Sequence, residues 1–197
     1  MTALVAAANV LVYVAELCSP DPDAFIDAFA YVPYDLTAGI VLPPPSPPWP
    51  PLTVLSALFV HASVLHLAFN LLFFVAVAPA IEALCGRVRF ALLYLCAGLG
   101  AALAQVAIAP QSHLPVVGAS GAIAGIMGAF LVTYPGVRVV FGIPAFVLIG
   151  AWAILQFASS YALVTGAAQP AAGTAYLAHA GGLCVGVLGI GLFKRRA

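Results

Sequence analysis

The chain has 197 residues, of which 64% are hydrophobic and only 6% are charged, and its six basic and six acidic residues leave no net charge. Its mean hydropathy is +1.16, whereas soluble domains carry about 25% charged residues. This composition excludes a water-soluble fold, and the lack of net positive charge argues against a nucleic-acid partner. We therefore expect a single polytopic membrane domain over residues 1–197.

Apolar segments suited to membrane helices recur along the chain, separated by clusters of charge and proline. A spanning helix needs about 20 mostly apolar residues, and these continuous runs lack the alternation of barrel strands. The predicted fold class is therefore an all-α membrane protein with a long external first loop. The first segment lacks the basic start of a secretory signal peptide, so we expect it to span as well. The six expected helices are 3–17, 54–80, 90–109, 120–134, 144–161 and 175–193.

The charged residues orient this arrangement, because basic residues gather in cytoplasmic loops. With the N-terminus in the cytoplasm, all the basic residues fall on that side: Arg87, Arg89, Arg138, Lys194, Arg195 and Arg196. The same count places the first loop outside, where most of the acids lie: Glu16, Asp21, Asp23, Asp27 and Asp35. We expect a multi-pass protein of a bacterial plasma (inner) membrane, with both termini cytoplasmic.

The external first loop, 19–53, is the one stretch of soluble-like composition. Its proline-rich end, 43–51, favours polyproline II and cannot continue a helix. Before it, the aromatic face of 23–32 predicts a short helix lying in the membrane interface. A rigid connector and a role in substrate access both remain open for this loop.

Four polar residues fall at matching depths in three of the expected helices. The helices over 54–80, 120–134 and 175–193 all enter from outside, and they carry His66 and Asn70, Ser120, and His179 near that end. Polar groups buried in a bilayer are functional candidates by default. A serine hydroxyl becomes a nucleophile when a base removes its proton, and histidine suits that role. Because no acidic residue shares this depth, the prediction is a Ser120–His179 dyad opening to the extracytoplasmic side.

A tetrahedral intermediate also needs donors for its oxyanion. The backbone N–H of Ser120 is free for this role because the first turn of a helix leaves its N–H groups unpaired. His66 and Asn70 are four residues apart and share a helix face, so their side chains can add two more donors.

Glycines beside both halves of the predicted dyad indicate close helix packing. Small residues spaced by four let helix backbones approach in lipid. The stripes adjoin Ser120 on one helix and His179 on the other, so packing them together would bring the two side chains into contact. The glycines expected at the site are Gly118, Gly121, Gly125, Gly182 and Gly186.

The sequence also contains residues suited to two other kinds of site, a metal site and a transport path. His61, His66 and His179 are potential metal ligands, but no carboxylate or cysteine joins them, so we expect no metal and no cofactor. A small transporter would need polar groups along a path to the inner side. Gln105 and Gln156 are the obvious further candidates for such a path.

Three motifs, in this order and at this spacing, resemble the rhomboid intramembrane serine proteases over about residues 49–193. They are His61-Ala-Ser-Val-Leu-His66-Leu-Ala-Phe-Asn70, Gly118-Ala-Ser120-Gly121 and Ala178-His179-Ala-Gly-Gly182-Leu-Cys-Val-Gly186. The resemblance implies a six-helix rhomboid-like bundle with Ser120 as nucleophile, His179 as general base, and His66, Asn70 and the Ser120 N–H as the oxyanion hole. It also implies that the partners are the lipid bilayer and single-span membrane proteins as substrates. The alternative is a catalytically silent rhomboid-like protein that binds membrane clients, and the sequence leaves the oligomeric state open.

The chain departs from the family pattern at two positions. Many rhomboids pair tryptophan with arginine in the first loop, and here Trp49 is followed by Pro50. The family often places an aromatic ring four residues after the serine to stack on the histidine, and here that position is Ala124.

Overall fold

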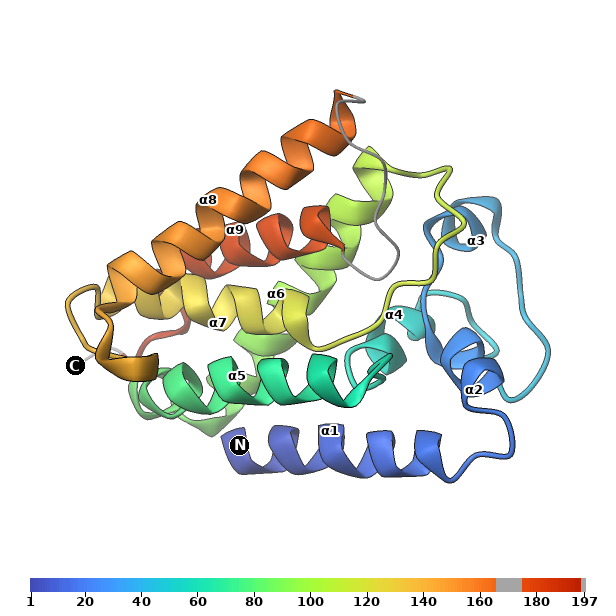
Figure 1. Cartoon of the computed structure of the whole chain (residues 1–197), viewed down its shortest axis with the longest axis horizontal. Coiled ribbons are helices and arrows are strands. Elements are labelled where there is room, and N and C mark those ends of the chain that lie inside the picture. Colours follow the sequence, from blue (N-terminus) through green and yellow to red (C-terminus); the bar gives the residue numbers. More distant parts are fainter. Residues whose placement is uncertain (166–174, 196–197) are drawn as a thin grey trace.

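The computed structural model describes residues 1–165 and 175–195, which form an all-helical bundle (Figure 1). In the described part of the chain the backbone forms no strand, and two isolated β-bridges are its only extended pairings. The helices are α1 (Thr2–Leu17), α2 (Pro22–Phe29), α3 (Pro33–Ala38), α4 (Leu52–Ala57), α5 (Val64–Cys85), α6 (Arg87–Ile108), α7 (Ser120–Thr133), η1 (Val140–Gly142), α8 (Ala145–Val164) and α9 (Tyr176–Phe193).

Six of these helices are apolar and make up the bundle. Four of them, α5, α6, α8 and α9, are long and apolar enough to cross a membrane, while α1 and α7 have 16 and 14 residues. At 1.5 Å per residue, α7 is about 21 Å long, less than the roughly 30 Å of the hydrocarbon core. It begins at Ser120 and is buried from Gly121 to Phe130. Helix α7 is therefore too short to cross the hydrocarbon core and is enclosed by its neighbours over most of its length.

The prediction of a single continuous helix for the second span is wrong. Instead of one helix over 54–80, the chain forms α4, breaks at residues 58–63, and restarts as α5. Ser63 causes the restart, because its hydroxyl oxygen accepts a hydrogen bond from the N–H of His66 at 3.1 Å and so caps α5. The other five expected ranges differ from the observed helices by at most three residues at either end.

The first loop folds against the segment that leads into α7. The backbones of Tyr31 and Val116 exchange both hydrogen bonds, at 3.2 and 2.9 Å, and the N–H of Tyr34 donates to the carbonyl of Ser112 at 3.0 Å. The expected helix over 23–32 is observed as α2, which ends earlier, and α3 was not expected. In Figure 1, α2, α3 and α4 accordingly gather beside the chain that enters α7.

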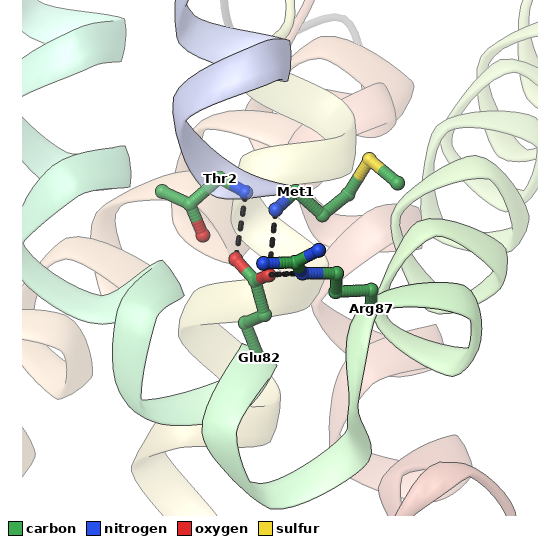
Figure 2. Close-up of polar contacts among 4 residues, drawn as sticks. All are labelled: Met1, Thr2, Glu82 and Arg87. Atoms are coloured by element: carbon green, nitrogen blue, oxygen red, sulfur yellow. Dashed lines mark hydrogen bonds and ion pairs between the residues drawn. The ribbon is translucent and has the colours of Figure 1, made fainter.

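Helix α1 is tied to the bundle at both ends. At its start, the Glu82 carboxylate accepts hydrogen bonds from the Met1 amino group at 2.6 Å and the Thr2 N–H at 2.7 Å; Figure 2 shows both bonds beside the more distant Arg87. A carboxylate at a helix N-terminus also complements the helix dipole. At its far end, the buried Glu16 accepts a hydrogen bond from the backbone N–H of His61 at 3.3 Å.

The packing of α7 against α9 depends on the absence of side chains. A Cβ atom built on Gly182 would overlap the carbonyl oxygen of Gly121, and one on Gly186 would overlap that of Gly125. The two backbones are therefore in direct contact, as the glycine stripes predicted. Helices α5 and α6 pack against other sides of α7, which makes it the centre of the bundle.

We expect Gly186→Ala to destabilise the protein by about 1–3 kcal/mol, because the added methyl group must push α9 away from α7. Thermal unfolding in detergent micelles measures this as a lower Tm. Gly191→Ala in the same helix is the matched control, since a Cβ there has no neighbouring atom within 4 Å. Equal Tm values for the two variants would contradict the close α7–α9 contact.

Candidate active site

Ser120 and His179 meet where the first turns of α7 and α9 come together. Ser120 is the first residue of α7, and His179 lies in the first turn of α9, where its N–H donates to the carbonyl of Ala175 at 3.1 Å. The Ser120 Oγ and the His179 Nε2 are 2.7 Å apart, within hydrogen-bonding distance. Gly121 and Gly182, which allow the backbones to touch, lie one and three residues beyond the two side chains.

His66 lies beside this pair, against Gly118. The φ angle of Gly118 is +113°, a conformation that favours glycine, and a Cβ there would lie 2.7 Å from two atoms of the His66 ring and 3.7 Å from the Ser120 Oγ. The Gly118 N–H donates to the carbonyl of Ala57 at 2.8 Å, which holds the entry to α7 in place. Gly118 therefore leaves room for the His66 ring next to the serine.

Asn70 lies one turn after His66 on the same face of α5. It is buried, and its amide nitrogen donates to the backbone carbonyl of His66 at 2.9 Å. A primary amide has two N–H donors, so this bond leaves one for another acceptor. Ser120, His179, His66 and Asn70 all line one cavity of about 720 Å³.

Helix α8 contributes two residues to this cavity, Trp152 and Gln156. The Gln156 Oε1 lies 2.7 Å from the His179 Nδ1, and the Trp152 and His179 rings are 5.6 Å apart at an angle of 43°. The sequence had marked Gln156 only as a possible element of a transport path and had not singled out Trp152. These two residues are four positions apart, which puts an indole and an amide on one helix face, and this spacing could have indicated that they act at the same site.

The two departures from the expected pattern also have places in the structure. Ala124 is fully buried in the core of α7, and the aromatic ring against His179 comes from Trp152 instead. Trp49 and Pro50 form the turn into α4, where the Pro50 carbonyl accepts the N–H of Thr53 at 2.9 Å and its hydroxyl at 2.6 Å. A proline suits this place because a helix start leaves N–H groups unpaired anyway.

His61 does not line the cavity but packs behind one of its lining residues, His66. It is fully buried in the turn between α4 and α5, its Nδ1 donates to the carbonyl of Phe59 at 3.2 Å, and its ring meets the His66 ring edge-on at 5.1 Å. Burial, with a smaller effect of His66, lowers the pKa of His61 to about 4. Within residues 1–165 and 175–195, no three potential ligand side chains cluster as a metal site would require.

Comparisons with known proteins show which family the sequence resembles. The sequence model of the Rhomboid domain matches residues 48–196. The Rhomboid protease GluP of Bacillus subtilis is 41% identical over 78 residues, which is 40% of this chain and 15% of that protein. Rhomboid protein 1, mitochondrial, of Saccharomyces cerevisiae is 28% identical over 145 residues, 70% of this chain and 40% of that protein. Inactive rhomboid protein 1 of Drosophila melanogaster is 33% identical over 78 residues, 40% of this chain and 5% of that protein.

The low pKa of His61 makes stability depend on pH. The unfolded chain binds a proton at this histidine near pH 6.5, whereas the folded chain does so only near pH 4. The contribution of His61 to stability therefore falls as the pH drops from about 6.5 to about 4, by up to about 3 kcal/mol, and this contribution changes no further below that range. We expect His61→Gln to flatten this part of the profile, measured by guanidinium unfolding in micelles between pH 7.5 and 4. Parallel profiles for the two proteins would contradict this assignment.

Proposed function

We propose that this chain, which belongs to the rhomboid family, is an intramembrane serine endopeptidase that cleaves transmembrane segments of membrane proteins. The observation that carries the proposal is the 2.7 Å contact between the Ser120 Oγ and the His179 Nε2. A serine hydroxyl is a weak nucleophile unless a base within hydrogen-bonding reach takes its proton. The contact supplies that base inside an integral membrane protein.

The chemistry follows from the two contacting atoms. The Ser120 Oγ attacks the carbonyl carbon of a peptide bond while its proton moves to the His179 Nε2. When the tetrahedral intermediate collapses, the C–N bond breaks, and His179 returns the proton to the leaving amine. Water then hydrolyses the acyl-enzyme by the same steps, with His179 again as the base. This catalytic cycle requires no cofactor.

Three donors surround the position of the developing oxyanion. In the proposed mechanism they are the backbone N–H of Ser120, the second amide N–H of Asn70 and the His66 ring; the proximity of the His66 ring to Gly118 and Ser120 supports this assignment. Donors held in advance at this position stabilise the transition state more than the ground state. The N–H at a helix start adds the positive end of the α7 dipole.

The placement of the basic residues supports an orientation in the membrane. Arg89 donates to the carbonyl of Lys194 at 3.2 Å, so the end of α9 lies beside the start of α6. Basic residues favour the cytoplasmic side, and on this basis both termini are cytoplasmic and the cavity opens toward the extracytoplasmic side of a bacterial plasma membrane. Substrates would be single-span membrane proteins whose helices enter the cavity laterally from the lipid.

We expect Ser120→Ala and His179→Ala each to lower cleavage of a model single-span substrate in proteoliposomes by about 10⁴-fold or more. Ser159→Ala, which changes a serine of α8 outside the cavity, is the control and should cleave normally. Cleavage that persists without the Ser120 hydroxyl would refute the mechanism. A wild-type protein that binds the substrate but never cleaves it would instead identify a silent client-binding member of the family.

We expect Asn70→Leu to lower kcat by about 10²–10³-fold while leaving KM within a few-fold, since the lost donor acts in the transition state. Asn9→Leu is the matched control, because it removes a buried asparagine of α1 that does not line the cavity. A change confined to KM would show that Asn70 binds the ground state and would remove it from the oxyanion site.

A further inference from the structure

The two ring nitrogens of His179 have different partners. Nε2 faces the Ser120 hydroxyl of α7, and Nδ1 faces the side-chain carbonyl oxygen of Gln156 in α8, both at 2.7 Å. The imidazole therefore bridges two helices, and only the first of these contacts has a part in the chemistry described so far.

Gln156 lies on the inward face of α8 together with Trp152. Gln156 is 8% exposed, whereas its neighbours Leu155 and Phe157 are 63% and 46% exposed. Trp152 precedes it by one helical turn, so the indole packs on the His179 ring while the amide reaches its edge. These two contacts restrict both tilting and flipping of the imidazole.

The bond to Gln156 also selects one tautomer of His179. In this structure the Gln156 Oε1 faces Nδ1, and because that oxygen can only accept a hydrogen bond, the proton of the neutral ring resides on Nδ1 in this arrangement. Nε2 then carries the lone pair and accepts the Ser120 hydroxyl proton. In the opposite tautomer Nε2 would itself be protonated and unable to act as base.

A neutral acceptor suits this depth in the membrane. A carboxylate would hold the same tautomer, as aspartate does in Ser–His–Asp triads, but burying a charge in a bilayer is costly. An amide oxygen makes the same hydrogen bond without a charge. Its dipole also points its negative end at the ring, which becomes positive when His179 takes the serine proton.

We propose that Gln156 is the positioning residue of the catalytic dyad, completing a Ser120–His179–Gln156 chain across α7, α9 and α8. This inference rests on the proposed function, because it concerns how His179 serves as the base.

A small fluorophosphonate probe tests the step without depending on substrate binding. The Ser120 Oγ forms a bond to phosphorus, fluoride leaves, and the serine proton passes to the His179 Nε2. We expect Gln156→Met, similar in length but with only a weak thioether acceptor, to lower the second-order rate of labelling by about 10- to 100-fold. Gln156→Glu keeps an oxygen acceptor and should label at least ten times faster than Gln156→Met, by the same reasoning about the acceptor.

Leu155→Met, on the exposed face of α8, is the control and should label at the wild-type rate. A Gln156→Met protein that labels like wild type would overturn the proposal. Equal losses in Gln156→Met and Gln156→Glu would also overturn it, because packing alone would then explain the effect. A wild-type protein that fails to label would count against the proposed function rather than against Gln156.

The tautomer gives a second test that remains valid if Gln156→Met does not fold. Nitrogen-15 NMR of histidine-labelled wild-type protein distinguishes the protonated from the unprotonated ring nitrogen, and the His179 signals are assigned by their loss in His179→Ala. We expect Nδ1 to be protonated at neutral pH. Protonation of Nε2 in the neutral ring would overturn the proposal by itself.

Discussion

The direct backbone contact between α7 and α9 sets the distance on which the rest of the site depends. Gly182 lies against the carbonyl of Gly121, and Gly186 against that of Gly125, so the helices approach more closely than any pair carrying side chains at these positions. Ser120 and His179 lie immediately beside this contact, so the separation of the two helices also sets the distance between these two side chains. A hydrogen bond of 2.7 Å tolerates little change, and one methyl group in the interface would separate the two side chains. In lipid, where apolar side chains gain little from leaving the solvent, such close packing is also a main source of helix association.

Around Ser120 and His179, each neighbouring segment holds one further part of the site in position. The break before α5, capped by Ser63, brings His66 to the serine, and the first loop holds the chain that enters α7 through the Tyr31–Val116 pairing. Helix α8 supplies the contacts to the far side of the His179 ring. The site is thus assembled from four helices, α5, α7, α8 and α9, and its first and last residues, His66 and His179, lie more than a hundred positions apart in the sequence. Because each side chain has its own support, a change in one element is expected to disturb one function at the site rather than all of them.

The sequence predicted the members of the cavity better than it predicted the course of the backbone. Ser120, His66, Asn70 and His179 were placed at one depth by charge and hydropathy, and the structure brings them to one cavity. The break between α4 and α5 was missed because residues 58–63 are still mostly apolar, so hydropathy alone cannot show where hydrogen bonding is interrupted. The Ser63 cap was the local signal that could have shown it. Gln156 and Trp152 were missed as a pair for another reason: nothing along the sequence states which face of α8 meets α9, and that is decided only by packing.

In membrane proteins the length of a helix usually matches the thickness of the bilayer, but the short helix α7 does not have to match it. Buried from Gly121 to Phe130, α7 takes its position from its neighbouring helices rather than from the lipid, while the longer outer helices must match the thickness of the bilayer by tilting. The vertical position of Ser120 relative to the headgroups is then fixed by the outer helices. A thicker or thinner membrane would shift a substrate helix relative to Ser120 without altering the contact with His179. On the proposed function, bilayer thickness would help to select which peptide bond of a spanning helix lies level with the nucleophile.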